Sequence, residues 1–260
     1  MPAPVIADLT TAKKVGFIVP SSNTAVETLT LSILQSLQAN MIPLFTRLQV
    51  LTLSADSKTT SQFTSDKLIT AAQLLADAGA DHIIWNGTSG MFTGGTLADD
   101  RGLAEDITKA VGVPCSTNTI ATIEALEFLA IKDVSIAVPY TDEVTSKVRS
   151  FYEKEGFNVH AAVAQKPTPK NNLDIAKCSE NEIKAVVKES IVPGKTKAVL
   201  IACTNYPGTA YAADLEQELA GDEIRVLDSI AVSAWYALRE VDIKQTSKRL
   251  EGWGLLLNSL

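Results

Sequence analysis

An internal repeat of about half the chain length constrains the fold more than any other feature of this sequence. Three pairs of segments align in the same order along the 260 residues: 15–20 (VGFIVP) with 134–139 (VSIAVP), 81–88 (DHIIWNGT) with 197–204 (KAVLIACT) and, more weakly, 117–126 with 229–238. The offsets within the pairs are similar, at 119, 116 and 112 residues. The chain therefore consists of two related halves, and each half is long enough to bury a hydrophobic core.

Short apolar runs alternate with longer helical patterns in both halves. Most of these runs are continuous, which is typical of parallel strands that are buried on both faces. The sequence predicts eight strands, at residues 15–19, 45–51, 82–85, 113–116, 134–138, 159–164, 198–202 and 225–227. Ser179 with Glu182 three residues later predicts a capping box at the start of one intervening helix. Eight such units fit either a closed barrel or two open sheets, and the half-length repeat favours two open sheets.

We therefore predict an α/β fold of two pseudo-symmetric domains, each a four-stranded parallel sheet flanked by helices. The first domain comprises residues 1–117 and the C-terminal residues 229–260, and the second comprises residues 118–228. The C-terminal segment is assigned to the first domain because residues 117–126 have the matching crossover role. Matching strand ends then face each other, and we predict the active site in the interdomain cleft.

Composition argues against several classes of function. The net charge of -7 and the lack of a Lys/Arg cluster argue against nucleic-acid binding. Three scattered cysteines without a CxxC pattern, with only two histidines, predict neither a disulfide framework nor a metal site. Residues 1–14 lack a signal-peptide core, and no apolar run approaches the roughly 20 residues of a membrane span. We expect a cytoplasmic protein with free thiols and no membrane partner, and a homo-oligomer is compatible with the sequence.

Four loops at predicted strand ends are rich in small polar residues: 20–24 (PSSNT), 86–90 (NGTSG), 139–142 (PYTD) and 203–205 (CTN). Ligands of open parallel sheets bind at such ends. The same residue types are ordinary helix N-caps, which is the alternative interpretation of any one loop. Together, their hydroxyls, amides and backbone N–H groups would form an anion cradle. A carboxylate suits this cradle better than a phosphate, because a phosphate site usually recruits a basic residue and we expect none beside these loops.

Cys203 follows the predicted strand 198–202, at a point where we expect a helix to begin. The dipole and hydrogen bonds of such a helix would lower the thiol pKa from about 8.5 toward neutrality. A thiol of this kind can deliver or remove a proton at carbon. The alternative is a small buried apolar residue, the interpretation that we adopt for Cys115, while Cys178 is assigned a structural or incidental place. The matching position in the first half is Gly87, so the thiol has no counterpart there.

These motifs resemble those of the aspartate/glutamate racemase superfamily, and within it the branch of maleate isomerases and arylmalonate decarboxylases. The resemblance covers nearly the whole chain and is most specific at residues 19–24 (VPSSNT) with Glu27, 87–89 (GTS), 138–140 (VPY), 171–172 (NN) and 203–204 (CT). It implies two pseudo-symmetric α/β halves and a small carboxylic acid as substrate. It also implies that neither a metal nor an organic cofactor takes part.

The resemblance further implies two sets of site residues. The catalytic set is Cys203, Thr88, Ser89 and Tyr140, and the substrate-binding set is Ser21, Ser22, Asn23, Gly87, Asn172 and Thr204. Asn23 with the two serines would hold one carboxylate. The hydroxyls of the catalytic set would hold a second carboxylate or the enediolate derived from it. Asn172 would add an amide from the second half, with its neighbour Asn171 as the alternative.

The chain departs from the two-cysteine pattern of this superfamily. Racemases and maleate isomerases of the superfamily carry a cysteine in both half-sites, whereas arylmalonate decarboxylases have glycine followed by Thr-Ser in the first. Gly87 matches the second pattern and would leave room for a substituent or the departing carboxylate. We therefore predict a decarboxylase that forms an enediolate, which Cys203 protonates on one face.

Three other functions remain as alternatives. One is a maleate cis–trans isomerase or a racemase-type isomerase, and another is a carboxylate-binding protein without turnover. The third is a nucleotide-binding α/β protein. The sequence disfavours it, because residues 91–95 (MFTGG) are rich in glycine but no GxGxxG or P-loop pattern occurs.

Overall fold

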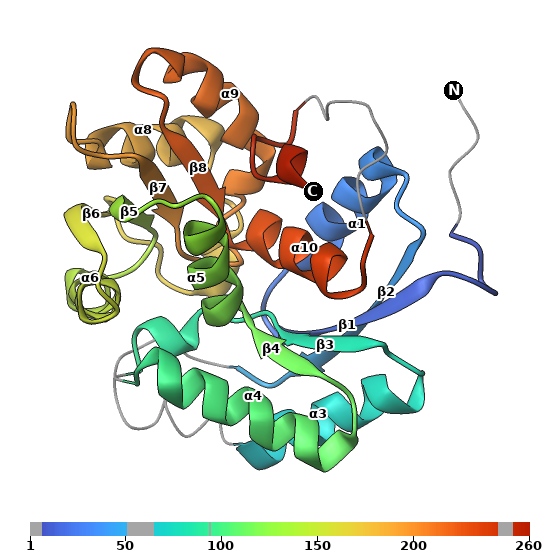
Figure 1. Ribbon diagram of the computed structural model, residues 1–260. Helices are drawn as coiled ribbons and strands as arrows, with labels where there is room; N and C mark the ends of the chain where they lie inside the picture. Colours follow the sequence, from blue (N-terminus) through green and yellow to red (C-terminus); the bar gives the residue numbers. More distant parts are fainter. Residues whose placement is uncertain (1–6, 51–64, 94, 244–251) are drawn as a thin grey trace.

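The computed structural model describes residues 7–50, 65–93, 95–243 and 252–260. Its framework is two separate four-stranded sheets, in which all neighbouring strands are parallel (Figure 1). The strand orders are β2-β1-β3-β4 and β6-β5-β7-β8, so the two sheets have the same internal order. The predicted fold class is confirmed.

The elements of the two halves follow each other in a similar sequence. The first half contains β1 (Lys13–Pro20), α1 (Val26–Leu37), β2 (Met41–Leu48), α3 (Ser65–Asp77), β3 (His82–Trp85), η2 (Ser89–Met91), α4 (Leu97–Val111), β4 (Cys115–Thr117) and α5 (Asn118–Phe128). The second contains β5 (Asp133–Val138), α6 (Asp142–Lys154), β6 (Asn158–Ala164), α7 (Asn172–Ile175), α8 (Glu180–Ser190), β7 (Ala198–Ile201), η3 (Gly208–Tyr211), α9 (Ala212–Glu218), η4 (Ala220–Asp222), β8 (Arg225–Asp228), α10 (Ser229–Glu240) and η5 (Leu257–Ser259). The capping box at Ser179 and Glu182 is confirmed at the start of α8.

All eight predicted strands are present, and the largest differences lie at β2 and β4. β2 begins at Met41, four residues before the predicted start, and it includes Pro43. It is an edge strand, where a residue without an N–H group is tolerated, and its half-exposed side chains do not form a continuous apolar run. Its predicted end, residue 51, lies outside the described residues. β4 begins later than predicted, directly after Pro114, which has no N–H group for the ladder.

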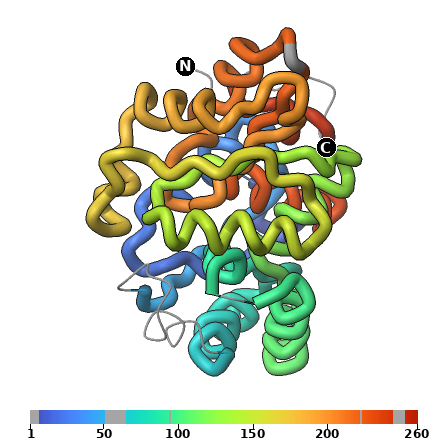
Figure 2. The backbone as a smooth tube through the Cα atoms, turned by 90° about the vertical axis from the view of Figure 1, so that its left-hand side faces the viewer, coloured from blue at the N-terminus to red at the C-terminus, as the bar shows by residue number. Residues whose placement is uncertain are grey.

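Helices cover both faces of the first sheet, which explains the continuous apolar runs of its central strands. Side chains on one face of β1 and β3 pack with α3 and α4, and those on the other face pack with α1 and α10. Figure 2 shows α3 and α4 together at the lower end of the molecule. In the second sheet, α8 packs on β5, β6 and β7, and α9 packs on β8. Burial on both faces is the arrangement that parallel strands require.

Two helices cross between the halves. α5 follows the last strand of the first sheet, and α10 follows the last strand of the second, and the two helices pack against each other (Figure 1). The Nδ2 of Asn118 donates to the Ser229 carbonyl and to the Ser233 hydroxyl, both at 2.8 Å. α10 also contacts α1 and β3. The C-terminal residues contact the second half instead, since the backbone N–H of Leu255 donates to the Glu216 carboxylate of α9 at 2.6 Å. The assignment of residues 229–260 to the first domain therefore stays a prediction.

Two absences hold for the described ranges only. No helix within them combines the length and the apolar character needed to cross a membrane. Their His, Cys, Asp and Glu side chains form no group of three or more that could hold a metal ion.

Candidate active site

A cavity lies between the two halves, where the polar ends of their central strands meet. Its lining residues are Pro20, Asn23, Val50, Trp85, Gly87, Thr88, Ser89, Phe92, Tyr140, Asn172, Cys203, Thr204 and Asn205. They include the whole predicted catalytic set and all of the predicted substrate-binding set except Ser21 and Ser22. The cavity is narrow, because only about 20 Å³ of it can hold the centre of a water-sized sphere. This is about the space of one water molecule, so only a small ligand suits it.

Asn172 bridges the halves at one side of the cavity. Its Nδ2 donates to the Ser22 hydroxyl at 2.8 Å, and its backbone carbonyl accepts a 2.6 Å hydrogen bond from the Asn205 amide. The Oδ1 of Asn205 in turn accepts from the backbone N–H of Thr24 at 2.9 Å. Asn171 instead caps α7 and lies at the surface. The structure thus places Asn172, and not Asn171, at the cavity. It adds Asn205, which the sequence analysis named in a polar loop but left out of the two sets of site residues.

Asn23 combines a local role with a cross-half contact. Its Oδ1 accepts from the backbone N–H groups of Ala25 and Val26, and this fixes the start of α1. Its Nδ2 donates to the Thr204 hydroxyl at 3.1 Å. A carboxylate bound here would replace the hydrogen bond between the Asn23 amide and the Thr204 hydroxyl, and both groups could then donate to it. The bonds of the Asn23 Oδ1 at the start of α1 would stay in place.

Arg47 holds the loop that carries Asn23. Its guanidinium donates to the carbonyls of Ser21 and Asn23 at 3.0 and 2.8 Å and pairs with Glu27 at 2.7 Å. The expectation of no basic residue beside the polar loops is therefore wrong, because the β1–β2 pairing brings residue 47 next to the end of β1. Three of the five N–H donors of Arg47 bind groups of this part of the protein, so it shapes the loop.

The hydroxyl groups of the two serines in this loop form hydrogen bonds with the backbone of Val50. The Ser21 hydroxyl accepts from the backbone N–H of Val50 at 3.0 Å, and the Ser22 hydroxyl donates to the Val50 carbonyl at 3.2 Å. Neither lines the cavity, in contrast to the substrate-binding role that we expected for both. Their hydroxyls fix the position of Val50, which does line it.

Three hydroxyl groups face the cavity from both halves. Thr88 and Tyr140 are hydrogen-bonded at 3.0 Å, and Ser89 accepts from the indole N–H of Trp85 at 3.4 Å. Burial raises the pKa of Tyr140 well above its ordinary value, so its hydroxyl keeps its proton. The side chains can therefore serve as neutral hydrogen-bond donors to an anion.

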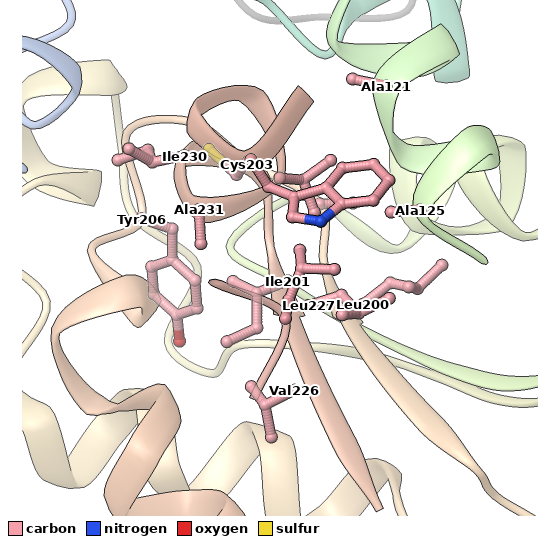
Figure 3. Close-up of a cluster of buried hydrophobic side chains, with 14 of the residues drawn as sticks. Ala121, Ala125, Leu200, Ile201, Cys203, Tyr206, Val226, Leu227, Ile230 and Ala231 are labelled. Atoms are coloured by element: carbon pink, nitrogen blue, oxygen red, sulfur yellow. The ribbon is translucent and has the colours of Figure 1, made fainter. Parts of the chain in front are cut away.

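Cys203 lies in the turn after β7 and is 3% exposed. Figure 3 shows it within the buried cluster that also contains Ile201, Tyr206 and Ile230. The expected lowering of its pKa is wrong, because burial raises the pKa to about 11, although Tyr140 and two backbone N–H groups stabilise the thiolate. No helix begins at this turn, and the next regular element is the short η3. At neutral pH the group is a thiol, which donates a proton and is a poor nucleophile.

Asp228 is a buried acid next to this turn that the sequence analysis missed. It ends β8, where its register partner on β7 is Ile201. Its Oδ1 accepts hydrogen bonds from the Thr209 hydroxyl and from the backbone N–H of Ile230, and the second of these bonds caps the start of α10. Burial raises its pKa to about 7. A partly ionised carboxyl group this close adds to the cost of forming the Cys203 thiolate.

Gly87 does not leave the space that we expected for a substituent. A Cβ atom at this position would lie 2.7 Å from Cε2 and 2.9 Å from Cη2 of Trp85, and closer still to Cζ2. The six-membered ring of the indole therefore fills the region beside the glycine. The sequence gives no sign of this contact, because it depends on the side-chain orientation of Trp85.

Comparison with known proteins places the chain in a defined group. The family model described as arylmalonate decarboxylase matches residues 15–255. A curated relative, a maleate isomerase of Pseudomonas putida strain KT2440, is 25% identical over 260 residues, which cover 96% of this chain and 99% of the relative. The superfamily branch inferred from the motifs is thereby confirmed.

Solved structures of two kinds share the fold. The maleate isomerase Iso of Pseudomonas putida S16 has a TM-score of 0.83 at 21% identity and covers 95% of this chain and 98% of its own. A Nocardia farcinica maleate cis–trans isomerase, as a cysteine-to-serine variant with a covalently bound succinylcysteine intermediate, has a TM-score of 0.82 at 22% identity, covering 96% and 99%. Arylmalonate decarboxylase has a TM-score of 0.75 at 18% identity, covering 95% and 100%. At these identities the similarity concerns the fold.

The raised pKa of Cys203 predicts slow alkylation at neutral pH. Below the pKa the thiolate fraction rises tenfold per pH unit, so the rate with iodoacetamide should rise about tenfold per unit from pH 7 to 10. Peptide mass spectrometry over time separates Cys203 from the other two cysteines. Free cysteine is the control, and its rate should level off above its ordinary pKa of about 8.5. A Cys203 rate that levels off below pH 9 would contradict the buried-thiol description.

The raised pKa of Asp228 predicts a stability that falls with rising pH. The folded protein holds the proton up to about pH 7, whereas the unfolded carboxyl group loses it near its ordinary value of 3.8. The resulting stability is complete below pH 3.8 and is lost as the pH rises to about 7, on the order of 4 kcal/mol in all. Asp228→Asn should remove this dependence, as measured by urea unfolding at a series of pH values. The exposed Asp106→Asn is the control, and equal pH profiles for Asp228→Asn and wild type would refute the assignment.

Proposed function

The chain belongs to the arylmalonate decarboxylase family, and on that premise we propose that it decarboxylates a small malonate-type diacid without a cofactor. The observation that carries this proposal is the protonated, buried thiol of Cys203 at a cavity that places Gly87 at the mirrored position. One thiol at one face is what the protonation of an enediolate requires. A reaction that needs a thiol on each face of the substrate lacks its second thiol here, because Cys203 alone among the described cysteines lines the cavity.

The reaction balances with the groups at the cavity. The bond between the α-carbon and the departing carboxylate breaks, and its electron pair passes into the enediolate of the retained carboxylate. The S–H proton of Cys203 then forms the new C–H bond, and the thiolate regains a proton from water. A neutral thiol with a raised pKa is suited to this step, because the enediolate is a far stronger base than the thiolate.

Two groups of hydrogen-bond donors would contact the retained carboxylate, one in the ground state and the other as the enediolate forms. The amides of Asn23 and Asn172, with the Thr204 hydroxyl, would bind it in the ground state. The hydroxyls of Thr88, Ser89 and Tyr140 would stabilise the charge that develops in the enediolate, each worth about 10²–10³ in rate if well aimed. The neutral Tyr140 can donate throughout, because burial keeps its proton in place.

The departing carboxylate would face the apolar part of the lining. Pro20, Val50, Trp85 and Phe92 supply this wall, and all except Pro20 are hydrophobic side chains at most 2% exposed. A carboxylate is poorly solvated there, while carbon dioxide is neutral, so the wall favours loss of charge. The small volume favours malonates with small α-substituents.

A second candidate is maleate cis–trans isomerisation, which the curated relative favours. In that reaction a cysteine adds to the double bond, and the Nocardia structure carries such a succinylcysteine in a variant that has lost another cysteine. That protein therefore has two cysteines, whereas this cavity is lined by Cys203 alone among the described cysteines. Its raised pKa also opposes nucleophilic addition, so decarboxylation ranks first.

A diacid screen in deuterated water tests the leading proposal. Malonate, methylmalonate, ethylmalonate and phenylmalonate are followed by carbon dioxide release and by NMR of the monoacid. We expect one deuterium at the α-carbon, and Cys203→Ala should lower kcat by about 10²–10⁴ because the proton donor is gone. Cys115→Ala is the matched control and should retain the wild-type rate. Full activity of Cys203→Ala would show that another group protonates the product.

A proton NMR time course with maleate tests the second candidate. We expect no fumarate, because the site lacks a ready thiolate. Rapid formation of fumarate by wild type, abolished in Cys203→Ala, would reverse the order of the two candidates. Saturable binding of diacids without conversion of any would instead identify a carboxylate-binding protein.

A further inference from the structure

The two half-sites differ at a second pair of positions besides Gly87 and Cys203. In the β3–β4 pairing Trp85 lies opposite Thr117, and in the β7–β8 pairing Ile201 lies opposite Asp228. Trp85 and Ile201 are therefore structural counterparts, each two residues before the mirrored position. The half with cysteine has an aliphatic residue there, and the half with glycine has an indole.

The indole and the glycine fit each other closely. A Cβ atom on Gly87 would come within 3 Å of three ring atoms, a separation that real Cβ atoms do not show. The clash therefore arises at the Cβ atom itself, whichever χ1 rotamer the sulfur of a cysteine would adopt. Trp85 is 2% exposed and belongs to the buried cluster that contains Ile18, Ile83 and Leu68. Moving the ring away from Gly87 would therefore disturb the packing of this cluster.

We infer that Trp85 is a specificity-determining residue, whose indole takes the place of a second thiol and closes one face of the substrate's α-carbon. The inference rests on the proposed function, and it explains how a nearly symmetric frame would yield a one-sided reaction. The ring offers no acid to that face, since its only N–H group is directed to Ser89. Among the described cysteines, Cys203 is then the one thiol at the cavity that can protonate the α-carbon.

A thermodynamic cycle tests the steric part without any substrate. Gly87→Cys should lower the melting temperature by several degrees, because the new side chain overpacks against the indole. In a Trp85→Leu background, the same Gly87→Cys change should cost less than half of that shift. Gly102→Cys is the matched control, because a Cβ there meets nothing within 4 Å, and it should leave the melting temperature within about a degree.

Hydrogen exchange tests the stereochemical part. The probe is enantiopure 2-methylbut-3-enoate in deuterated water, whose vinyl group acidifies the α-hydrogen. In the Trp85→Leu/Gly87→Cys variant the ionised fraction of the introduced cysteine can take the α-proton, the C–H electron pair enters the enediolate, and Cys203 returns a proton on the opposite face. We expect this variant to deuterate and racemise the probe at least tenfold faster than wild type, Trp85→Leu or Gly87→Cys, by NMR and chiral chromatography.

The outcomes separate this inference from the proposed function. Equal destabilisation by Gly87→Cys in both backgrounds would overturn the inference, whether or not any malonate is a substrate. Racemisation by Gly87→Cys alone, at the rate of the double variant, would also overturn it, since the indole would not be a barrier. A third outcome would overturn only the decarboxylase proposal. In it, wild type converts no malonate, but the melting-temperature shifts are non-additive and the double variant racemises the probe rapidly.

Discussion

The packing of α5 against α10 sets the separation of the two half-sites. Each helix leaves the last strand of one sheet and crosses toward the other half, so the sheets cannot move apart without exposing both helices. A chain of buried hydrogen bonds runs from Asn118 to Ser233 and on to Asn86, which precedes Gly87. The same contact that joins the halves therefore also fixes the backbone of the first half-site. A narrow cavity between the two halves is the result.

Burial between these walls decides the protonation state of the groups at and beside the cavity. Cys203, Tyr140 and Asp228 are all shifted toward their neutral forms, because water is excluded and the described residues near them supply no compensating cation. Arg47, the nearest basic group at the first-half loop, uses its donors on backbone carbonyls and Glu27. The site thus binds anions through neutral donors, and its acid is strong enough only for a carbanion-like base. This is an electrostatic reason to expect chemistry at carbon.

Hydrophobic periodicity and the internal repeat predict those features that depend on residues close together in the chain. Features that depend on tertiary contacts could not be predicted in this way. The eight strands and the capping box at Ser179 follow from residues that are neighbours in the chain. The pKa of Cys203 could not be predicted from its strand-end position, because the expected helix is absent and the burial comes from remote segments. Arg47 and Asp228 were missed for a related reason, since sheet register alone brings them to the polar loops. Trp85 was interpreted only as strand, although its ring defines the first half-site.

The pseudo-symmetry of the frame continues beneath both half-sites, with the partners exchanged. In the second half the strand-end Asp228 accepts from Thr209, and in the first half the strand-end Thr117 donates to Asp100 at 3.1 Å. Each carboxyl group also abuts a glycine of the overlying turn, since a Cβ on Gly90 or Gly208 would lie 2.5 or 2.9 Å from its oxygen. A buried acid–hydroxyl pair thus supports the turn of both half-sites. Both half-sites have such a pair, so the one-sidedness of the site depends on Cys203 on one face and the Trp85–Gly87 pair on the other.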